Sequence, residues 1–280
     1  MIDLHVHTTF SDGKETLEQV LQRAERLGMT AISITDHDTV AAYEALKDPK
    51  VRGLFSGKIL VGTELSTVLD GILVHIKGFG FDPTKMAKAL AKKNVIHVSD
   101  FWCFVKQEMQ AVFDKHGIEA DFSHCKTHCD VAREVLKLIH LLPVELDVTS
   151  ETTDNKVSIL YWKYMYKPNN ALSLPLEKMF MSTQDAIALI RECGGKAVVA
   201  HPRQYYNFAD HVLNALVDKV DGIECFHWSA NPEYREKLLQ ICRDNNLIVT
   251  GGTDFHACGK RDLNHEQIPA ELINQFKKFV

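Results

Sequence analysis

The sequence predicts an α/β barrel into which a mainly helical segment is inserted, and three observations support this. Short apolar runs alternate with stretches of helical periodicity, which is typical of parallel strands joined by helices. Polar residues of metal-binding types stand where the apolar runs end, as the functional residues of such barrels do. The alternation fails only between residues 83 and 181.

The composition is that of an ordinary globular protein. The chain has 280 residues, of which 45% are hydrophobic and 25% charged, and one barrel with an insertion fits this length. The net charge of −5 disfavours capture of nucleic-acid backbones, so duplex nucleic acid is not expected as a partner. With no signal-peptide pattern and no apolar run of the ~18 residues that span a bilayer, we expect a cytoplasmic protein without a membrane partner. Seven cysteines without a regular framework predict reduced thiols.

The first third of the chain contains four apolar runs and one clear helix. MIDLHVH ends at His7, and AISITDHD follows a helix expected from Thr16 to Gly28. Thr16 suits an N-cap, apolar residues recur at helical spacing, and Gly28 can end the helix. The runs ILVGTE and ILVHIKGFGF then carry Glu64 and His75. Each run is a candidate strand.

The last third repeats the alternation three times. In each repeat an amphipathic stretch precedes an apolar run of strand length. The expected helices are Ser182–Gly194, Asp210–Val220 and Pro232–Asn246, and the strands after them are Lys196–Ala200, Gly222–Phe226 and Leu247–Thr250. Such alternation indicates a parallel sheet whose carboxyl ends meet at one mouth.

The stretch between these two parts predicts a separate, mainly helical domain. Helical periodicity persists in Thr84–Lys115 and Asp130–Leu142, whereas Asp147–Lys156 is polar. An aromatic stripe follows, for which packing against the barrel is favoured over a base-stacking surface. The stripe consists of Tyr161, Trp162, Tyr164 and Tyr166. The predicted domains are a barrel of residues 1–82 and 182–280 and an inserted substrate cap of residues 83–181.

Nine residues of metal-binding type stand at or near the ends of the apolar runs. They are His5, His7, Asp12, His37, Glu64, His75, His201, Asp254 and His256. Imidazole and carboxylate without cysteine suit Mn²⁺, Fe²⁺ or Zn²⁺. His5 and His7 share one strand face, because alternate residues point the same way. Singly, such residues are more often core, rim or turn residues, but nine together exceed the needs of one ion and indicate a polynuclear site.

The mixed ligand set predicts hydrolysis. A carboxylate such as Glu64 can bridge two ions, which a neutral imidazole cannot do. Two ions ~3.5–4 Å apart would hold a shared hydroxide and stabilise both the attacking and the leaving oxygen of an in-line displacement at phosphorus. The chain has no P-loop, dinucleotide-binding glycine fingerprint, G-x-S-x-G elbow or H-E-x-x-H motif, which excludes the enzyme classes built on them.

The order of these motifs resembles that of the PHP family, the polymerase and histidinol phosphatase family of metal-dependent phosphoesterases. The matching segments are DLHVHTTFSDG, ITDHDT, GTELS, AHP and GTDFH. The resemblance implies a distorted, TIM-like (β/α)7 barrel with three divalent metal ions at the strand C-termini. It implies a first ion held by His5, His7, Glu64 and Asp254, a second held by Asp12, His37 and His256, and a third held by Glu64, His75 and His201.

The motif order, with an insertion between His75 and His201, is most similar to the PHP subgroup that acts on nucleoside 3′,5′-bisphosphates and short RNA ends. This implies a phosphomonoesterase in which a metal-bridged hydroxide attacks a small, nucleotide-like phosphate ester. No residue stands out as the general acid.

The sequence departs from that subgroup at the expected substrate-binding residues. The cap arginine that precedes an Ala-Arg-x-Leu helix is absent, and Lys126, His128 and Arg133 are the candidate substitutes. Arg203 lies one place earlier than the subgroup's arginine. It is still the expected phosphate-binding residue, because a guanidinium can contact two phosphate oxygens at once.

Other interpretations stay open. A cyclic phosphodiesterase or a histidinol-phosphatase-like enzyme would use the same ligands, and a metal-dependent binding module would use them without catalysis. A C–N hydrolase of the amidohydrolase type is disfavoured, because no lysine that could be carbamylated is expected at the strand ends. An H-C-x-x-H-C cluster could bind a further metal, although structural zinc usually draws ligand pairs from two separated segments. Its residues are His124, Cys125, His128 and Cys129.

Overall fold

The chain divides into two compact units in a computed structural model that describes residues 1–93, 98–142, 147, 152–257 and 262–263. The first unit contains the described residues of Met1–Thr67, Val74–Val95 and Met181–Val280, and the second those of Val68–Leu73 and Ile96–Phe180. Cys258 and residues 148–151 of the polar stretch Asp147–Lys156 lie outside the described residues.

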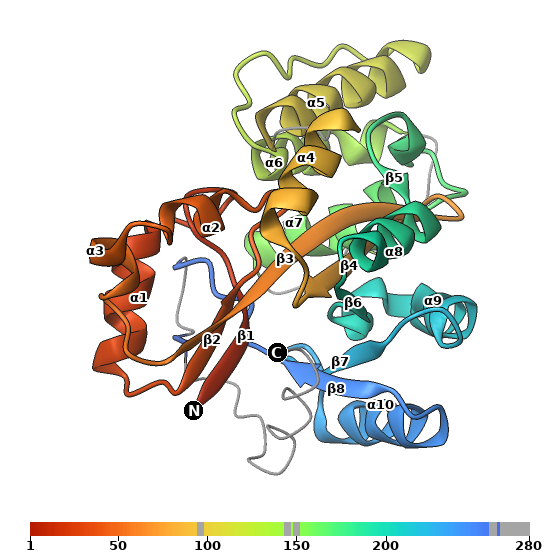
Figure 1. The fold of residues 1–280 in the computed structure, drawn as a ribbon. Helices are drawn as coiled ribbons and strands as arrows, with labels where there is room; N and C mark the ends of the chain where they lie inside the picture. Colours follow the sequence, from red (N-terminus) through yellow and green to blue (C-terminus); the bar gives the residue numbers. More distant parts are fainter. Residues whose placement is uncertain (94–97, 143–146, 148–151, 258–261, 264–280) are drawn as a thin grey trace. The chain divides into compact units, whose positions relative to one another are not determined.

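The first unit is built on a sheet that nearly closes into a barrel (Figure 1). Its strands follow the order β1-β2-β3-β4-β6-β7-β8, and a short β5 pairs with β3. The segment after β8 completes the ring, because Val6 forms a parallel bridge with Phe255 and His7 N donates to Phe255 O at 2.9 Å. The strands are β1 Ile2–Val6, β2 Ala31–Ile34, β3 Lys58–Leu69, β4 Ile72–Phe79, β5 Met181–Ser182, β6 Lys196–Val199, β7 Gly222–Phe226 and β8 Ile248–Gly251. The barrel predicted from the sequence is thus confirmed.

The prediction of a wholly parallel sheet is wrong for β4, which pairs antiparallel with β6. The cause is local. Only Asp70 and Gly71 separate β3 from β4, and both have positive φ angles, of 50° and 75°. Two such residues form a type I′ hairpin turn, which can join only antiparallel strands. The Asp-Gly pair between two apolar runs was the available sequence signal.

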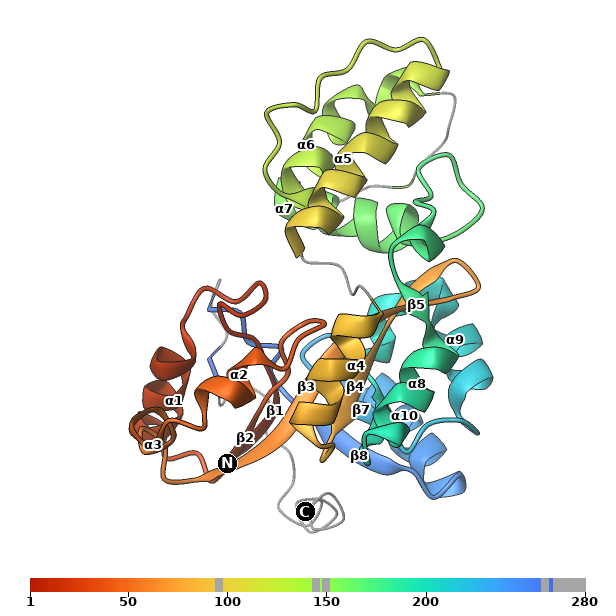
Figure 2. The same cartoon turned by 45° about the horizontal axis from the view of Figure 1, so that its top comes forward.

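The predicted helices of the barrel are present and cover the outside of the sheet (Figure 2). Thr16 caps α1 and forms a capping box with Gln19, and Ser182 caps α8. Such caps satisfy backbone N–H groups that have no helical partner and contribute about 1 kcal/mol each. The helices are α1 Leu17–Arg26, α2 Ala41–Ala45, α3 Pro49–Arg52, α4 Pro83–Lys92, α8 Thr183–Glu192, α9 Ala209–Leu216 and α10 Pro232–Asp244.

The alternation of side chains along β1 explains how the barrel presents its polar residues. Ile2 and Leu4 belong to an apolar cluster with residues of β7, β8 and α10. The intervening Asp3 and His5 must therefore face the other side of the sheet, the barrel interior, because side chains alternate with period two. All four side chains are buried, so an apolar layer outside the strands supports a polar layer within.

The second unit is mainly helical and has a core of its own. Its elements are α5 Val98–Lys115, α6 His128–Leu138, η1 Ile139–Leu141, α7 Thr153–Ile159, η2 Leu160–Met165 and η3 Leu176–Lys178. The aromatic stripe packs against this core, with Tyr166 buried inside it. α4 falls in the first unit, where it contacts α8, so the units divide later in the chain than residue 82.

Two predictions from composition can be compared with the described part of the chain. The six cysteines found there are free thiols. No described helix combines the length and the apolar character that crossing a membrane requires.

Candidate metal centre

All nine predicted metal ligands lie in the first unit, and their side chains converge in three groups. In the first group, His5 Nε2 lies 2.9 Å from Glu64 Oε2 and 3.3 Å from Asp254 Oδ1. His7 Nε2 lies 3.2 Å from the same Glu64 oxygen and 3.3 Å from Asp254 Oδ1. These four residues are the set that the resemblance assigned to one ion.

The second group surrounds Asp12, which follows β1 in the loop before α1. His256 Nε2 lies 3.2 Å from Asp12 Oδ1, and His37 Nε2 lies 4.0 Å from Asp12 Oδ2. His7 Nδ1 also approaches Asp12, at 3.6 Å. The geometry therefore adds His7 to the three residues expected here.

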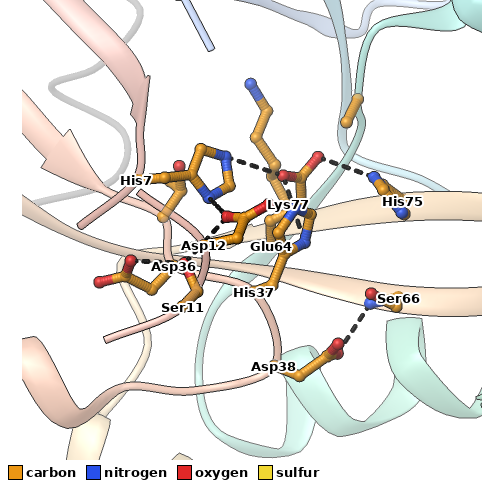
Figure 3. A network of polar contacts seen from close by, with 12 residues as sticks. His7, Ser11, Asp12, Asp36, His37, Asp38, Glu64, Ser66, His75 and Lys77 are labelled. Carbon is orange, nitrogen blue, oxygen red and sulfur yellow. Dashed lines mark hydrogen bonds and ion pairs between the residues drawn. The ribbon is translucent and has the colours of Figure 1, made fainter. Parts of the chain in front are cut away.

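The third group uses the other oxygen of Glu64. His201 Nε2 lies 3.0 Å and His75 Nδ1 lies 3.4 Å from Glu64 Oε1, and these two nitrogens are 3.3 Å apart. His37 Nδ1 approaches Glu64 Oε2 at 3.6 Å. Glu64 thus stands between His7 and His37 on one side and His75 on the other (Figure 3), where a bridging carboxylate would stand.

The donor atoms fit divalent ions in chemistry and in spacing. Ligands about 2.1 Å from one ion lie roughly 3.0 Å apart in an octahedron and roughly 3.4 Å apart in a tetrahedron. The separations of 2.9–3.6 Å in the first group and around Glu64 have this range. Within the described residues, both ring nitrogens of the buried His7 lack a hydrogen bond of good geometry. Imidazole and carboxylate donors of this kind suit Mn²⁺, Fe²⁺ or Zn²⁺.

The electrostatics of the centre favour cations. Burial alone would lower the pKa of His5, but the carboxylates of Glu64, Glu224 and Asp254 raise it to about 10. At His37 burial prevails and lowers the pKa to about 3, which keeps this ring neutral as a metal ligand must be. Burial opposes ionisation of Glu64, yet the neighbouring histidines hold the pKa of its carboxyl well below the usual range.

Two buried carboxylates hold the loops that carry ligands. Asp36 accepts hydrogen bonds from Thr8 N at 2.7 Å, Thr8 Oγ1 at 2.8 Å and Ser11 Oγ at 2.7 Å (Figure 3). Asp3 accepts from His5 N at 3.1 Å and Thr253 N at 3.0 Å. The contacts of Asp36 fix the loop that leads to Asp12.

Three further residues beside the centre escaped the sequence analysis. Lys77 of β4 and Glu224 of β7 are fully buried and form an ion pair next to His5. Lys77 lies within β4 and not at its end, and its ammonium is paired with Glu224. His227, which follows β7, lies with Nε2 3.5 Å from Asp254 Oδ2 and Nδ1 2.8 Å from Ser229 Oγ. Lys77 and Glu224 could have been noticed in the sequence, because each is a charged residue inside an otherwise apolar run, HIKGF and GIECF.

The residues predicted to bind substrate are distributed over both units. Arg203 follows His201 in the first unit, is exposed, and lies with its guanidinium carbon 5.5 Å from the centroid of the Tyr234 ring. Lys126 and Arg133 are exposed in the second unit, where Arg133 pairs with Asp154 at 3.0 Å. The side chain of His128 lies outside the described residues. A substrate-binding role for these four residues stays a prediction.

In the H-C-x-x-H-C segment, the described donors do not converge as those of the barrel do. His124 pairs with Glu134 at 3.3 Å, while Cys125 is buried with its Sγ 3.9 Å from His124 Nε2. Among the side chains that the structure describes, no three donors of this segment form a metal-binding group.

Comparison with known proteins identifies the family. A sequence model described as the PHP domain matches residues 3–212. The chain belongs to the PHP family. This confirms the resemblance drawn from the five motifs, and with it the expected type of barrel.

Two curated PHP relatives are similar over nearly the whole chain. A 3′,5′-nucleoside bisphosphate phosphatase of Chromobacterium violaceum is 29% identical over 96% of this chain and 92% of its own. A phosphoribosyl 1,2-cyclic phosphate 1,2-diphosphodiesterase of Eggerthella lenta is 28% identical over 91% of this chain and 93% of its own.

A third curated relative and a solved structure extend the comparison. A 5′-3′ exoribonuclease of Escherichia coli K12 is 28% identical over 91% of this chain and 84% of its own. The solved structure, titled an amidohydrolase from Chromobacterium violaceum with bound sulfate, has a TM-score of 0.70 and 23% identity over 99% of this chain and 96% of its own. The structural likeness supports the fold alone.

Proposed function

We propose that this PHP protein is a metal-dependent phosphoesterase that hydrolyses a small, nucleotide-like phosphate monoester of the nucleoside 3′,5′-bisphosphate type. The observation that carries this proposal is the arrangement around Glu64. Its two oxygens face separate sets of histidines at 2.9–3.6 Å, five histidines in all. The other three predicted ligands, Asp12, Asp254 and His256, adjoin these sets. Such shared coordination suits a polynuclear hydrolytic centre.

The proposed centre holds three divalent ions of Mn, Fe or Zn. When bound, the ions would lower the pKa of water to supply a nucleophile at neutral pH and would neutralise negative charge on the phosphate. Glu64 would be a ligand common to more than one of these ions. Arg203 would contact phosphate oxygens in the bidentate manner that guanidinium allows.

The relatives share one type of reaction and differ in substrate. A bisphosphate phosphatase, a cyclic phosphodiesterase and an exoribonuclease all cleave a phosphorus–oxygen bond. This common chemistry supports phosphoester hydrolysis for the present chain. The preference for a nucleotide monoester rests on the motif order and on the bisphosphate phosphatase, which matches over most of both chains.

A cyclic phosphodiesterase is the second candidate, because the Eggerthella lenta relative of that activity matches equally well in identity and coverage. The two candidates predict different products. A monoesterase releases inorganic phosphate at each turnover, whereas a diesterase breaks one of two ester bonds and leaves the phosphate as a monoester.

The test is a substrate panel on protein of measured metal content. The Mn²⁺-loaded protein is assayed with nucleoside 3′,5′-bisphosphates, histidinol phosphate, sugar phosphates and cyclic phosphates. We expect phosphate release from the bisphosphates, and loss of activity after chelation or in Asp254→Asn. Activity that survives both treatments would contradict a metal-dependent mechanism. Failure of a fully metallated protein to turn over any ester would favour a binding module.

A further inference from the structure

Glu224 occupies a special place in the barrel because it contacts two predicted ligands from different groups. Its side chain is 0% exposed and carries a carboxylate between β1 and the loop after β6. His5 Nδ1 lies 3.0 Å from its Oε1 and 3.2 Å from its Oε2. Its Oε2 also accepts a hydrogen bond from the backbone N of His201 at 2.7 Å.

The contact with His5 determines which nitrogen of the ring carries the proton. Nδ1 faces both carboxylate oxygens of Glu224, with the Lys77 ammonium 3.2 Å away. When Nε2 serves as the metal ligand, the ring proton is on Nδ1, and Glu224 is the acceptor that holds it there. The neutral ring then presents a lone pair on Nε2, which lies beside Glu64 and Asp254. A carboxylate in this position fixes the tautomer and orientation of a metal-binding histidine and increases its basicity.

The contact with His201 fixes a strained piece of backbone. His201 has a φ of 26° and a ψ of 60°, a conformation that residues with a Cβ rarely adopt. Such a conformation persists only when surrounding contacts enforce it. The Glu224 carboxylate supplies one of them by accepting the His201 N–H, and so it holds the His201 side chain where Nε2 lies 3.0 Å from Glu64 Oε1.

Lys77 explains why Glu224 supports the ligands without being one of them. The ammonium group of Lys77, also 0% exposed, donates to Glu224 Oε1. Both oxygens of Glu224 are thus engaged, one by Lys77 and His5 and the other by the His201 N–H. A buried carboxylate that has its own cation does not need a metal ion for neutralisation.

We propose that Glu224, paired with Lys77, is a positioning residue of the metal centre. It sets the tautomer of His5 and the backbone of His201 together and thereby raises the affinity of two neighbouring ion sites. This inference rests on the proposed function in one respect, namely that the barrel centre binds divalent ions.

The test compares ion affinity in Glu224→Gln with that of the unaltered protein. Affinity for Mn²⁺ and Zn²⁺ is measured by competition with a chelating dye, and ion content by elemental analysis. An amide of the same shape cannot accept charge-assisted hydrogen bonds from three donors, so we expect affinity to fall about 10- to 100-fold, as for other residues that orient metal ligands. The variant also leaves the buried Lys77 without its carboxylate.

Two further variants separate positioning from general loss of stability. Glu224→Gln combined with Lys77→Met removes both buried charges, so the barrel folds without an uncompensated ammonium, but ion affinity stays low. Met86→Ala removes a fully buried side chain from α4, a helix that contacts α8 and carries no predicted ligand. It should lower the melting temperature and leave ion affinity unchanged.

Nitrogen-15 spectra of the Zn²⁺-loaded protein supply a direct readout. We expect a protonated Nδ1 on His5 in the unaltered protein and loss of that protected proton in both Glu224 variants. Unchanged ion affinity together with an unchanged His5 tautomer in Glu224→Gln would overturn the inference and leave the proposed function intact. Failure of the unaltered protein to bind any ion would overturn both.

Discussion

Replacement of Asp36 should distinguish a loop-fixing carboxylate from an ordinary turn residue. Asp36 accepts three hydrogen bonds, from Thr8 N, Thr8 Oγ1 and Ser11 Oγ, at 2.7–2.8 Å. Thr8 is fully buried, whereas Ser11 is partly exposed. In Asp36→Ala, water can therefore replace the acceptor for Ser11 but not readily for the two donors of Thr8.

The magnitude follows from the unsatisfied donors. Each buried donor without an acceptor costs about 1–3 kcal/mol, so two of them give about 2–6 kcal/mol, and we expect about 3 kcal/mol because a loop can relax. Asp36→Asn keeps an oxygen toward Thr8 N and Ser11 Oγ, and its amide can donate to the Thr8 hydroxyl oxygen. Its cost should be about 1 kcal/mol.

The assay is urea unfolding in the presence of chelator, so that ion binding does not contribute to stability. Trp102 and Trp162 belong to the second unit and Trp228 to the first. Changing the first two to Phe leaves Trp228 as a fluorescence probe of the barrel. Equal stability losses in the Ala and Asn variants would refute the reasoning. A second measurement is ion content, which should fall in Asp36→Ala because the loop carries Asp12.

Three other predictions address separate parts of the molecule. Burial lowers the pKa of Lys167 to about 7, so between pH 7 and 10.5 the unfolded chain binds more protons than the folded chain. The free energy of unfolding should therefore rise with pH over this range, by up to about 1.4 kcal/mol per pH unit. In Lys167→Met, this contribution should be absent from the urea-unfolding curves. Arg203→Lys should raise KM about tenfold with little change in kcat, because an ammonium cannot contact two phosphate oxygens as a guanidinium does. An unchanged KM in steady-state assays would exclude a phosphate-binding role for Arg203. Thr16→Ala should cost about 1 kcal/mol in unfolding free energy, because it removes the capping box of α1, with ester hydrolysis unaffected.

The sequence was sufficient where structure depends on short-range patterns. Thr16 and Ser182 were predictable caps because the N-cap position and the helical spacing after it are local features. The apolar runs were recognisable for the same reason and drew attention to all nine candidate ligands. Two ends of these runs were not strand ends, because Glu64 lies within β3 and His75 within β4. β4 was not predicted as antiparallel, although Asp70-Gly71 was a sufficient local signal. The prediction followed the regular strand–helix alternation of the rest of the chain and did not use this turn.

Long-range pairing could not be predicted in the same way. Arg133 pairs with Asp154 in the second unit, and Lys77 with Glu224 across 147 residues of chain. Neither pair has a spacing that identifies it. The sequence also did not determine which core the aromatic stripe packs against, because packing on the core of the second unit or on the barrel requires the same apolar surface.

Glu64 and Glu224 show why a buried carboxylate alone does not identify a metal ligand. Both lie in apolar strands and both are almost fully buried. Glu224 has a permanent cation of the chain, Lys77, against it. Glu64 is surrounded by imidazoles of His5, His7, His37, His75 and His201. An imidazole neutralises a carboxylate only while it holds a proton, and it binds a metal only after losing it. Once these imidazoles act as ligands, only a bound cation neutralises Glu64, whereas Glu224 keeps Lys77 in either case. This difference depends on tertiary partners and not on the sequence around either residue.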